Sequence, residues 1–417
     1  MTAVASESKP GPASQPSAVT PADLIAAAVA MRPELIERQA EVEATTYFAA
    51  DTHQKFLDSR LYDMYVPKMY GGLEVEVPTF MRVALELARG CMSTAWCFSL
   101  SANHALQVAS WFPRQVQDQV FANRDFRAAS VSAPTVRAEK VEGGYVLNGE
   151  VAYCSGIPYA TYYLGQTMVA DPDGGEPRMG MFLAPRDQFE RLDDWGDTLG
   201  LKGSGSHSIR FTNGFVPAEF VMEDINMVDI PVEGGTVGSE LHGNGMYSGR
   251  GLSIFTMTLA AIAIGGGYNA LDEFEDQMRT RKTPLPPVVS RMQDPDYQRF
   301  YGAALTKLAT AEAALMNVAQ QHMDLCRANV AGERPYTFVD DFRLAGIARE
   351  LVVQVWETVE KDLFRNIGSS AARNGERFER VFRDMAQAAG HRNTLLREQS
   401  YRTLAQLTLG LAPATQH

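Results

Sequence analysis

Apolar residues recur at every third or fourth position over two long parts of the chain and at every second position between them. The first spacing is typical of helices with one buried face, and the second is typical of strands. The sequence therefore predicts an N-terminal helical domain over residues 21–124, a middle β domain over 125–236 and a C-terminal helical bundle over 237–417.

The N-terminal part begins with a clear helix signal, because Thr20 can cap a helix whose first turn holds Pro21 and Asp23. Residues 1–20 are rich in Ala, Ser and Pro and have no apolar core, so we expect a disordered tail rather than a targeting peptide. Further helices are predicted over 77–87 and over the apolar run 95–109.

Short alternating segments fill the middle part. The strand candidates are 127–132, 136–141, 145–147, 161–169, 179–183 and 208–211. The Gly-containing segments 142–144 and 171–175 between them have the composition of hairpin turns. We predict a compact antiparallel sheet, closed as a barrel or bent as a sandwich.

The C-terminal part predicts four helices, over 252–280, 296–329, 338–364 and 386–409, and hence a four-helix bundle. The glycines 265–267 match the letters of a dinucleotide-binding motif but lie inside a helical pattern with no preceding strand, so we interpret them as sites of close helix packing. The longest apolar run, 252–264, is shorter than the ~20 residues of a membrane span and predicts a buried helix.

The composition of the chain argues against several classes of function. The 417 residues carry a net charge of −12 without a basic run, which argues against nucleic acid as a partner. The four cysteines (Cys91, Cys97, Cys154 and Cys326) lack the spacing of a metal site. We expect buried free thiols in a cytoplasmic protein that binds no metal and no membrane.

Four segments carry a resemblance to a known family. They are the Gly-rich turn Trp195…Leu199-Gly-Leu-Lys-x-Ser204, the strands at 129–134 and 147–156, and the helix that follows Arg250. Together they resemble the acyl-CoA dehydrogenase superfamily. The resemblance implies an α+β fold in which a flavin lies between the middle sheet and the C-terminal bundle.

Two departures from the dehydrogenases concern their catalytic base. Dehydrogenation needs a carboxylate to remove a proton next to a thioester. The usual C-terminal Glu is absent from 383–392, and the alternative Glu is replaced by Gly249. Pro284 also stands where the adenine-binding motif of the family has Phe.

A sister family fits better. His104, Ser155 in Tyr153-Cys-Ser-Gly156, and Arg383-Asp384 followed by His391 resemble the oxygenase components of two-component flavin-dependent monooxygenases, among them the 4-hydroxyphenylacetate and dibenzothiophene enzymes. The resemblance implies that reduced FMN or FAD reacts with O₂ to a C4a-hydroperoxide, which hydroxylates a small aromatic substrate. It further implies a separate NAD(P)H:flavin reductase and a homotetramer.

The resemblance also implies roles for individual side chains. Ser155 would bond flavin N5, and His391, with a pKa near neutrality, would serve the peroxide. His104 would bind a polar group of the substrate, with a core histidine as the alternative. Arg250 would neutralise the reduced flavin or its phosphate.

Other candidates rest on family position alone. For the flavin pocket they are Ser130, Ser132, Trp195 and Ser204, with Gly368 and Ser369 reaching the flavin of a neighbouring subunit. Tyr247 and Phe255 are candidates for the substrate cavity, although we favour core packing for both. His207 is expected to be a turn or surface histidine.

Two other classes of function stay open: an acyl-CoA dehydrogenase or oxidase with bound FAD, and a non-catalytic binding protein on the same fold. The sequence also leaves open the substrate, the atom that is oxygenated, and the choice between FMN and FAD.

Overall fold

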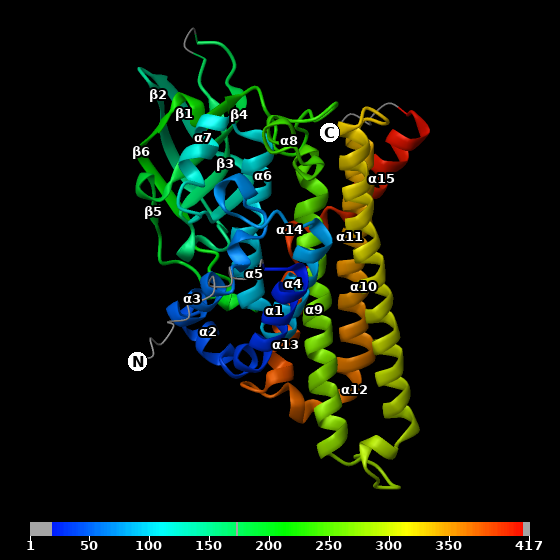
Figure 1. Ribbon diagram of the computed structural model, residues 1–417. Coiled ribbons are helices and arrows are strands. Elements are labelled where there is room, and N and C mark those ends of the chain that lie inside the picture. Colours follow the sequence, from blue (N-terminus) through cyan, green and yellow to red (C-terminus); the bar gives the residue numbers. More distant parts are fainter. Residues whose placement is uncertain (1–18, 172–173, 412–417) are drawn as a thin grey trace, which may run out of the picture.

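The computed structural model describes residues 19–171 and 174–411 and has three parts in the predicted order (Figure 1). A sheet lies on one side and the long C-terminal helices lie on the other, with several of the N-terminal helices between them. The α+β fold predicted from the sequence is confirmed. Most of the predicted 20-residue tail and part of the 171–175 turn fall outside the described residues.

Seven helices form the N-terminal part. They are α1 (Pro21–Glu37), α2 (Gln39–Thr45), α3 (Ala50–Asp58), α4 (Val77–Gly90), α5 (Met92–Ala102), α6 (His104–Trp111) and α7 (Arg114–Val120). Helix α1 begins as predicted, because Thr20 Oγ1 accepts from the Asp23 amide at 3.3 Å and the Asp23 carboxylate accepts from the Thr20 amide at 2.8 Å. The apolar run at 95–109 is two helices rather than one, with a break at Asn103.

The middle part is one seven-stranded sheet. Its strands are β1 (Ala128–Val141), β2 (Gly144–Val151), β3 (Tyr162–Val169), β4 (Arg178–Pro185), β5 (Glu190–Arg191), β6 (Ile209–Pro217) and β7 (Val221–Glu223), in the spatial order β5-β6-β2-β1-β3-β4-β7. The prediction of a purely antiparallel sheet is wrong, since β1 and β3 are parallel. Strands β2 and β3 lie on opposite sides of β1, so segment 152–161 must cross β1 between them.

Strand β1 contains a bulge opposite β3. Val131 pairs with Gly165 and Val136 pairs with Thr167, so β1 has three more residues than β3 over this interval. The Gln166 side chain holds the bulge, because its Nε2 donates to the Ser132 carbonyl and its Oε1 accepts from the Met227 amide at 2.7 Å. The strand predicted to touch the flavin therefore has a fixed bend.

The C-terminal part contains α8 (Val237–His242), α9 (Gly251–Thr280), α10 (Pro295–Val330) and α11 (Phe338–Thr358), with a π-helical turn and α12 (Arg365–Ile367) after α11. It ends with α13 (Arg377–Ala389), α14 (Arg392–Leu395) and α15 (Arg397–Leu409). Helices α9 and α10 begin and end within one residue of the prediction, and α11 reaches the predicted end at Phe364 only through its π-helical turn. The single helix predicted over 386–409 is wrong, because the chain turns at Gly390 and His391 caps a new helix.

Helix α9 is the central helix of the C-terminal part and packs against α4, α10, α11 and α13. Within residues 19–171 and 174–411 it is the one helix whose length and composition would suit a membrane span, and 89% of its most apolar window is buried by protein. Its glycines explain this close packing: a Cβ at Gly265 would lie 2.3 Å from the Leu85 carbonyl of α4. The interpretation of 265–267 as a packing motif is thus confirmed.

Substitution Gly265→Ala should lower the free energy of unfolding by about 1–3 kcal/mol, because the added methyl group overlaps the α4 backbone. Gly302→Ala on α10 is the matched control, since a Cβ there meets no atom within 4 Å. Removing that flexible glycine should stabilise the protein by about 0.5–1 kcal/mol. Urea unfolding measures both, and equal effects at the two positions would contradict the packing role.

Candidate active site

The indole of Trp96 on α5 joins three distant parts of the chain. Its Nε1–H donates to Ser155 Oγ at 3.0 Å, and its ring meets the His391 imidazole edge-on with 5.5 Å between centroids. Phe255 on α9 lies on another side of His391, with 6.3 Å between ring centroids. The structure therefore brings together Ser155, His391 and Phe255, which the sequence analysis named, around a tryptophan that it did not name.

A chain of hydroxyl groups leads away from Ser155. Ser155 Oγ lies 2.8 Å from Ser206 Oγ, which lies 2.7 Å from the fully buried Ser204 Oγ. An indole N–H can only donate, so Trp96 occupies a lone pair of Ser155 and leaves its proton free to be donated. Ser204, predicted as a flavin-pocket residue, thus supports Ser155.

The backbone around Ser155 is tightly constrained. Tyr153 adopts a left-handed conformation at φ 63° and Gly156 at φ 82°. A Cβ at Gly156 would come within 2.5 Å of the Cys97 carbonyl on α5, so only glycine allows this approach. The tight turn fixes Ser155 against the helix that carries Trp96.

His391 is the N-cap of α14, and its hydrogen bonding defines its tautomer. Nδ1 accepts from the Asn393 amide at 3.1 Å, so the neutral ring carries its proton on Nε2. Burial lowers the pKa of His391 to about 4, and the side chain is neutral at pH 7. The sequence analysis expected a pKa near neutrality; the desolvation of this site produces a neutral hydrogen-bond donor instead.

His104 is buried at the start of α6, and it is the opposite tautomer to His391, with its proton on Nδ1. Its Nδ1 donates to the Ala128 carbonyl at the start of β1, at 2.6 Å, which leaves Nε2 with the lone pair. Burial lowers its pKa to about 4. Its hydrogen bond goes to β1 rather than to the Trp96 cluster.

Arg250, at the N-terminus of α9, is almost fully buried and already paired. Its guanidinium group donates to Asp229 at 2.9 Å, to Glu233 at 2.8 Å and to the Tyr336 carbonyl at 3.1 Å. The charge that was predicted to face the flavin is therefore matched by two carboxylates of the chain itself. These partners lie 21 and 17 residues before Arg250 and could not be predicted from the sequence pattern.

The other predicted flavin residues have separate surroundings. Ser130 Oγ lies 3.9 Å from Met227 Sδ, and Ser132 is exposed. Trp195 Nε1 donates to the Leu201 carbonyl at 3.2 Å, and its ring meets Tyr153 edge-on with 5.8 Å between centroids.

Gly368 and Ser369 are exposed beyond α12, outside the Trp96 cluster. Tyr247 is fully buried and donates to the Tyr65 carbonyl at 3.2 Å, as the favoured core interpretation requires. The prediction of a turn or surface position for His207 is wrong in its exposure, because its side chain is fully buried. Its Nε2 lies 3.0 Å from Thr46 Oγ1, and burial lowers its pKa.

Arg383 and Asp384 on α13 anchor the loop that runs from Trp195 to Ser206. The Asp384 carboxylate accepts from the Leu201 amide at 2.6 Å and from Ser93 Oγ at 3.1 Å, and Arg383 donates to the Leu199 carbonyl at 3.0 Å. A Cβ at Gly200 would lie 2.1 Å from the Arg383 carbonyl. Burial raises the pKa of Asp384 to about 6. This part of the sequence motif therefore positions the site.

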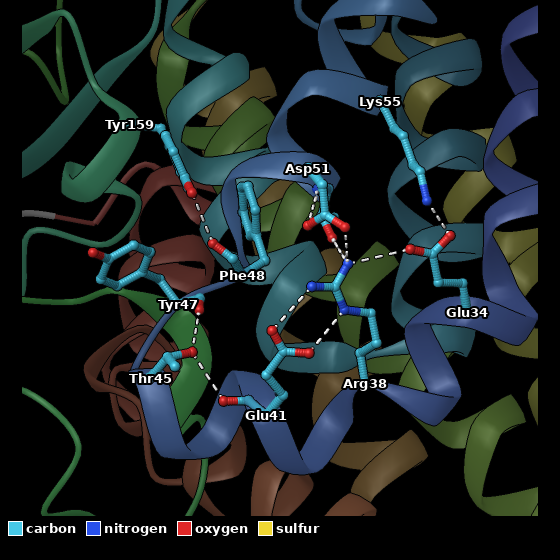
Figure 2. Close-up of polar contacts among 10 residues, drawn as sticks. Glu34, Arg38, Glu41, Thr45, Tyr47, Phe48, Asp51, Lys55 and Tyr159 are labelled. Atoms are coloured by element: carbon cyan, nitrogen blue, oxygen red, sulfur yellow. Dashed lines mark hydrogen bonds and ion pairs between the residues drawn. The ribbon is translucent and has the colours of Figure 1, made fainter.

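The same loop is anchored at its other end by the connection between α2 and α3, and Figure 2 shows the polar contacts of the N-terminal helices around this connection. Arg38 lies between α1 and α2 and pairs with Glu41 at 2.9 Å and with Asp51 of α3 at 2.7 Å. These helices fix the connection 46–49 between α2 and α3. The Gly205 amide donates to the Thr46 carbonyl of this connection at 2.8 Å. Figure 2 also shows Tyr159 donating to the Phe48 carbonyl, at 3.0 Å.

The position of the alternative dehydrogenase base cannot hold a side chain in this arrangement. A Cβ at Gly249 would lie 2.7 Å from His322 Nε2 and 3.0 Å from Cys326 Sγ. In the 383–392 stretch the one carboxylate is Asp384, which already accepts two hydrogen bonds. These contacts argue against the acyl-CoA dehydrogenase alternative.

Comparison with known proteins shows the family to which the chain is related. The family model of the acyl-CoA dehydrogenase N-terminal domain matches residues 25–119, and that of the C-terminal domain matches 257–395. The oxygenase component of p-hydroxyphenylacetate 3-hydroxylase from Acinetobacter baumannii is 27% identical over 80% of this chain and 76% of its own. The flavin-dependent monooxygenase oxygenase subunit HsaA from Rhodococcus jostii is 28% identical over 85% and 90%.

Solved structures show the same fold. The 3-HSA hydroxylase from Rhodococcus sp. RHA1 is 25% identical and superposes with a TM-score of 0.83 over 94% of this chain and 98% of its own. XiaF from Streptomyces, solved with FADH2 and glycerol, is 23% identical with a TM-score of 0.82 over 95% and 97%. TdsC from Paenibacillus, solved with FMN and indole, is 19% identical with a TM-score of 0.74 over 93% and 97%.

The chain belongs to the acyl-CoA dehydrogenase superfamily. Within it, the chain is the oxygenase component of a two-component flavin-dependent monooxygenase, of the class that hydroxylates aromatic compounds with reduced flavin. The function predicted from the sequence is confirmed at this level.

Substitution Asp384→Asn should change how stability depends on pH. The folded state holds the Asp384 proton up to a pKa of about 6, against an ordinary value of 3.8, so folding takes up a proton between these values. The contribution of Asp384 to the free energy of unfolding should therefore fall by about 3 kcal/mol as pH rises from about 4 to about 6 and stay constant above. Urea unfolding of wild type and variant at several pH values measures the difference, and parallel pH curves would contradict it.

Proposed function

We propose that the reactive edge of the flavin lies beside Ser155 and His391, with the substrate ring between the Phe255 side of this cluster and His104. The observation that carries this proposal is the Trp96 cluster, in which one indole contacts a hydroxyl from the middle part of the chain and an imidazole from the C-terminal part. When bound, the reduced flavin supplies the activation of O₂. The chain supplies donors, acceptors and a space from which water is excluded.

The hydrogen bonds of the three side chains give each a definite task. Ser155 Oγ would pair with flavin N5, while it accepts from Trp96 and exchanges a hydrogen bond with Ser206. His391 offers Nε2–H as a neutral donor to the oxygen atom that leaves as hydroxide. His104 offers the lone pair of Nε2 to the hydroxyl proton of a phenolic substrate.

Arg250 could bind the flavin only if the flavin replaced one of the carboxylates with which Arg250 is paired. Its carboxylates Asp229 and Glu233 are 58% and 52% exposed, so either can turn to solvent while the buried guanidinium group keeps its place. A negatively charged flavin atom could then accept from Arg250 in place of a carboxylate. Ser130, Ser132 and Trp195 complete the flavin pocket in this proposal.

The reduced flavin is FMN or FAD and comes from a separate NAD(P)H:flavin reductase. XiaF with FADH2 and TdsC with FMN support both flavins on this fold. We further propose a homotetramer, in which the exposed Gly368 and Ser369 reach the flavin of a neighbouring subunit. A cytoplasmic location is supported by four buried free cysteines.

The direct test mixes photoreduced FMN or FAD with the protein and O₂, with and without a panel of phenols, indoles and thiophenes. Slow flavin reoxidation in the presence of protein, together with an oxygenated aromatic product, supports the proposal. Reoxidation at the rate of free flavin with all flavin electrons recovered as hydrogen peroxide would refute it. Bleaching of a stably yellow enzyme by an acyl-CoA would favour the dehydrogenase instead.

Substitution His391→Asn should lower product formation by about 100-fold or more, as expected for loss of a positioned proton donor. Flavin affinity should stay within about threefold of wild type, since His391 bonds the α14 backbone rather than a charged group. Product is measured by chromatography and affinity by flavin fluorescence. Full retention of product formation would exclude His391 from the reaction.

Substitutions Ser155→Ala and Trp96→Phe should both raise the hydrogen peroxide released per flavin oxidised, with the larger effect for Ser155→Ala. The first removes the donor and the second removes the indole N–H that orients it while keeping an aromatic ring. Trp356→Phe on α11 is the matched control, since that ring packs on Phe382 outside the cluster, at 5.2 Å between centroids. The hydrogen-bond role fails if Trp96→Phe and Trp356→Phe release equal peroxide.

A further inference from the structure

A small cavity lies at the N-terminus of α9, where it meets α6 and α10. Its volume is about 10 Å³, the space of one water molecule or one hydroxyl group. Polar groups from Gln107, Trp111 and His322 line it, together with Gly249, Gly251 and Ile254.

Two buried polar atoms at this cavity have no hydrogen-bond partner in the described part of the chain. One is Nε2 of His322, a fully buried residue. The other is Oε1 of Gln107, a residue that is 7% exposed. Buried polar atoms are nearly always paired in native proteins. Two such atoms at one cavity indicate that a polar group binds there.

The space exists because two positions lack a side chain. A Cβ at Gly249 would lie 2.7 Å from His322 Nε2, and a Cβ at Gly251 would lie 3.1 Å from Gln107 Nε2 and 2.7 Å from the Trp111 ring. Any other residue at either position would therefore press on one of these polar side chains.

The cavity adjoins the proposed substrate site. Ile254 lines it, and the next residue of α9, Phe255, contacts His391. Gln107 lies three residues after His104 on α6, so the two share a helix face. Gly251 and Phe255 are one helical turn apart, which is about 6 Å. Gln107 and Gly251 therefore lie about one helical turn along α6 and α9 from His104 and Phe255, the residues proposed to contact the substrate.

The surroundings favour a neutral group. His322 Nδ1 lies 2.9 Å from Tyr336 Oη and 3.1 Å from Ser253 Oγ, and burial keeps the imidazole neutral. The buried Asp341 behind them accepts from the Ser253 amide and from Tyr336 Oη, and burial raises its pKa, so this network holds no positive charge that would attract a carboxylate. The charge of Arg250, the lining cation, is matched by Asp229 and Glu233.

We propose that this cavity binds a second, neutral hydroxyl group of the aromatic substrate, remote from the carbon that is oxygenated. The hydroxyl has one proton and donates it to Gln107 Oε1 or to His322 Nε2, so that one of the two unpaired acceptors is satisfied. The enzyme would therefore select dihydroxylated aromatic compounds over those with one hydroxyl. This inference rests on the proposed function, because it extends the same substrate site.

The test measures binding by calorimetry, without turnover, for three pairs that differ by one hydroxyl. The pairs are tyrosol and 4-ethylphenol, resorcinol and phenol, and 4,4′-biphenol and 4-phenylphenol. At least one dihydroxylated member should bind about tenfold more tightly than its partner. Gln107→Met and His322→Phe should remove that preference and leave the affinity of the monohydroxylated member within about twofold. Gln320→Met, on the exposed face of α10, is the control.

The wild-type measurement alone can overturn the inference. Equal affinity within every pair would mean that the cavity holds an ordered water only. Tighter binding of 4-hydroxyphenylacetate than of tyrosol would show that the site takes a carboxylate. Failure to bind any of the aromatic compounds would instead count against the proposed function, so the two failures are distinguishable.

Discussion

The hydrogen bond from Trp96 to Ser155 is the interaction on which the geometry of the site depends, because it joins the helical and β parts of the molecule at the reacting edge. The indole belongs to α5, the serine to the segment that crosses β1, and the histidine on the other side of the ring to the turn before α14. Because the indole N–H can only donate, the serine oxygen accepts from it, and the serine proton remains available to Ser206 or to a ligand. The buried surroundings then keep water from competing for it.

Much of the architecture could be predicted from the sequence, because helices α9, α10 and α11 have the regular apolar spacing that buried helices need. The parallel pairing of β1 with β3 could not, since strand order depends on contacts that alternation does not encode. The break at His391 was missed because an apolar pattern can continue through a turn, whereas a cap is visible only from its hydrogen bond to Asn393. Trp96 was missed because it lies in an apolar run and its partner is 59 residues away.

The candidate site residues show the same division. Ser155, His391 and Phe255 were named from motifs and lie together. Their protonation could not be read from the sequence, because desolvation lowers the pKa of both His104 and His391 to about 4. The site thus works with uncharged donors and acceptors, and its cation, Arg250, is matched by carboxylates that no motif indicated. Charge compensation is a property of the packed molecule.

The two anchors of the loop from Trp195 to Ser206 differ in their contact with solvent. The Arg38 pairs at one end involve Glu41 and Asp51, whose side chains are 46% and 60% exposed, so dissolved ions can weaken them. The Asp384 contacts at the other end are buried and insensitive to ions but responsive to acid. Higher ionic strength would therefore weaken one end of this loop, and a rise in pH from about 4 to about 6, which removes the Asp384 proton, would weaken the other.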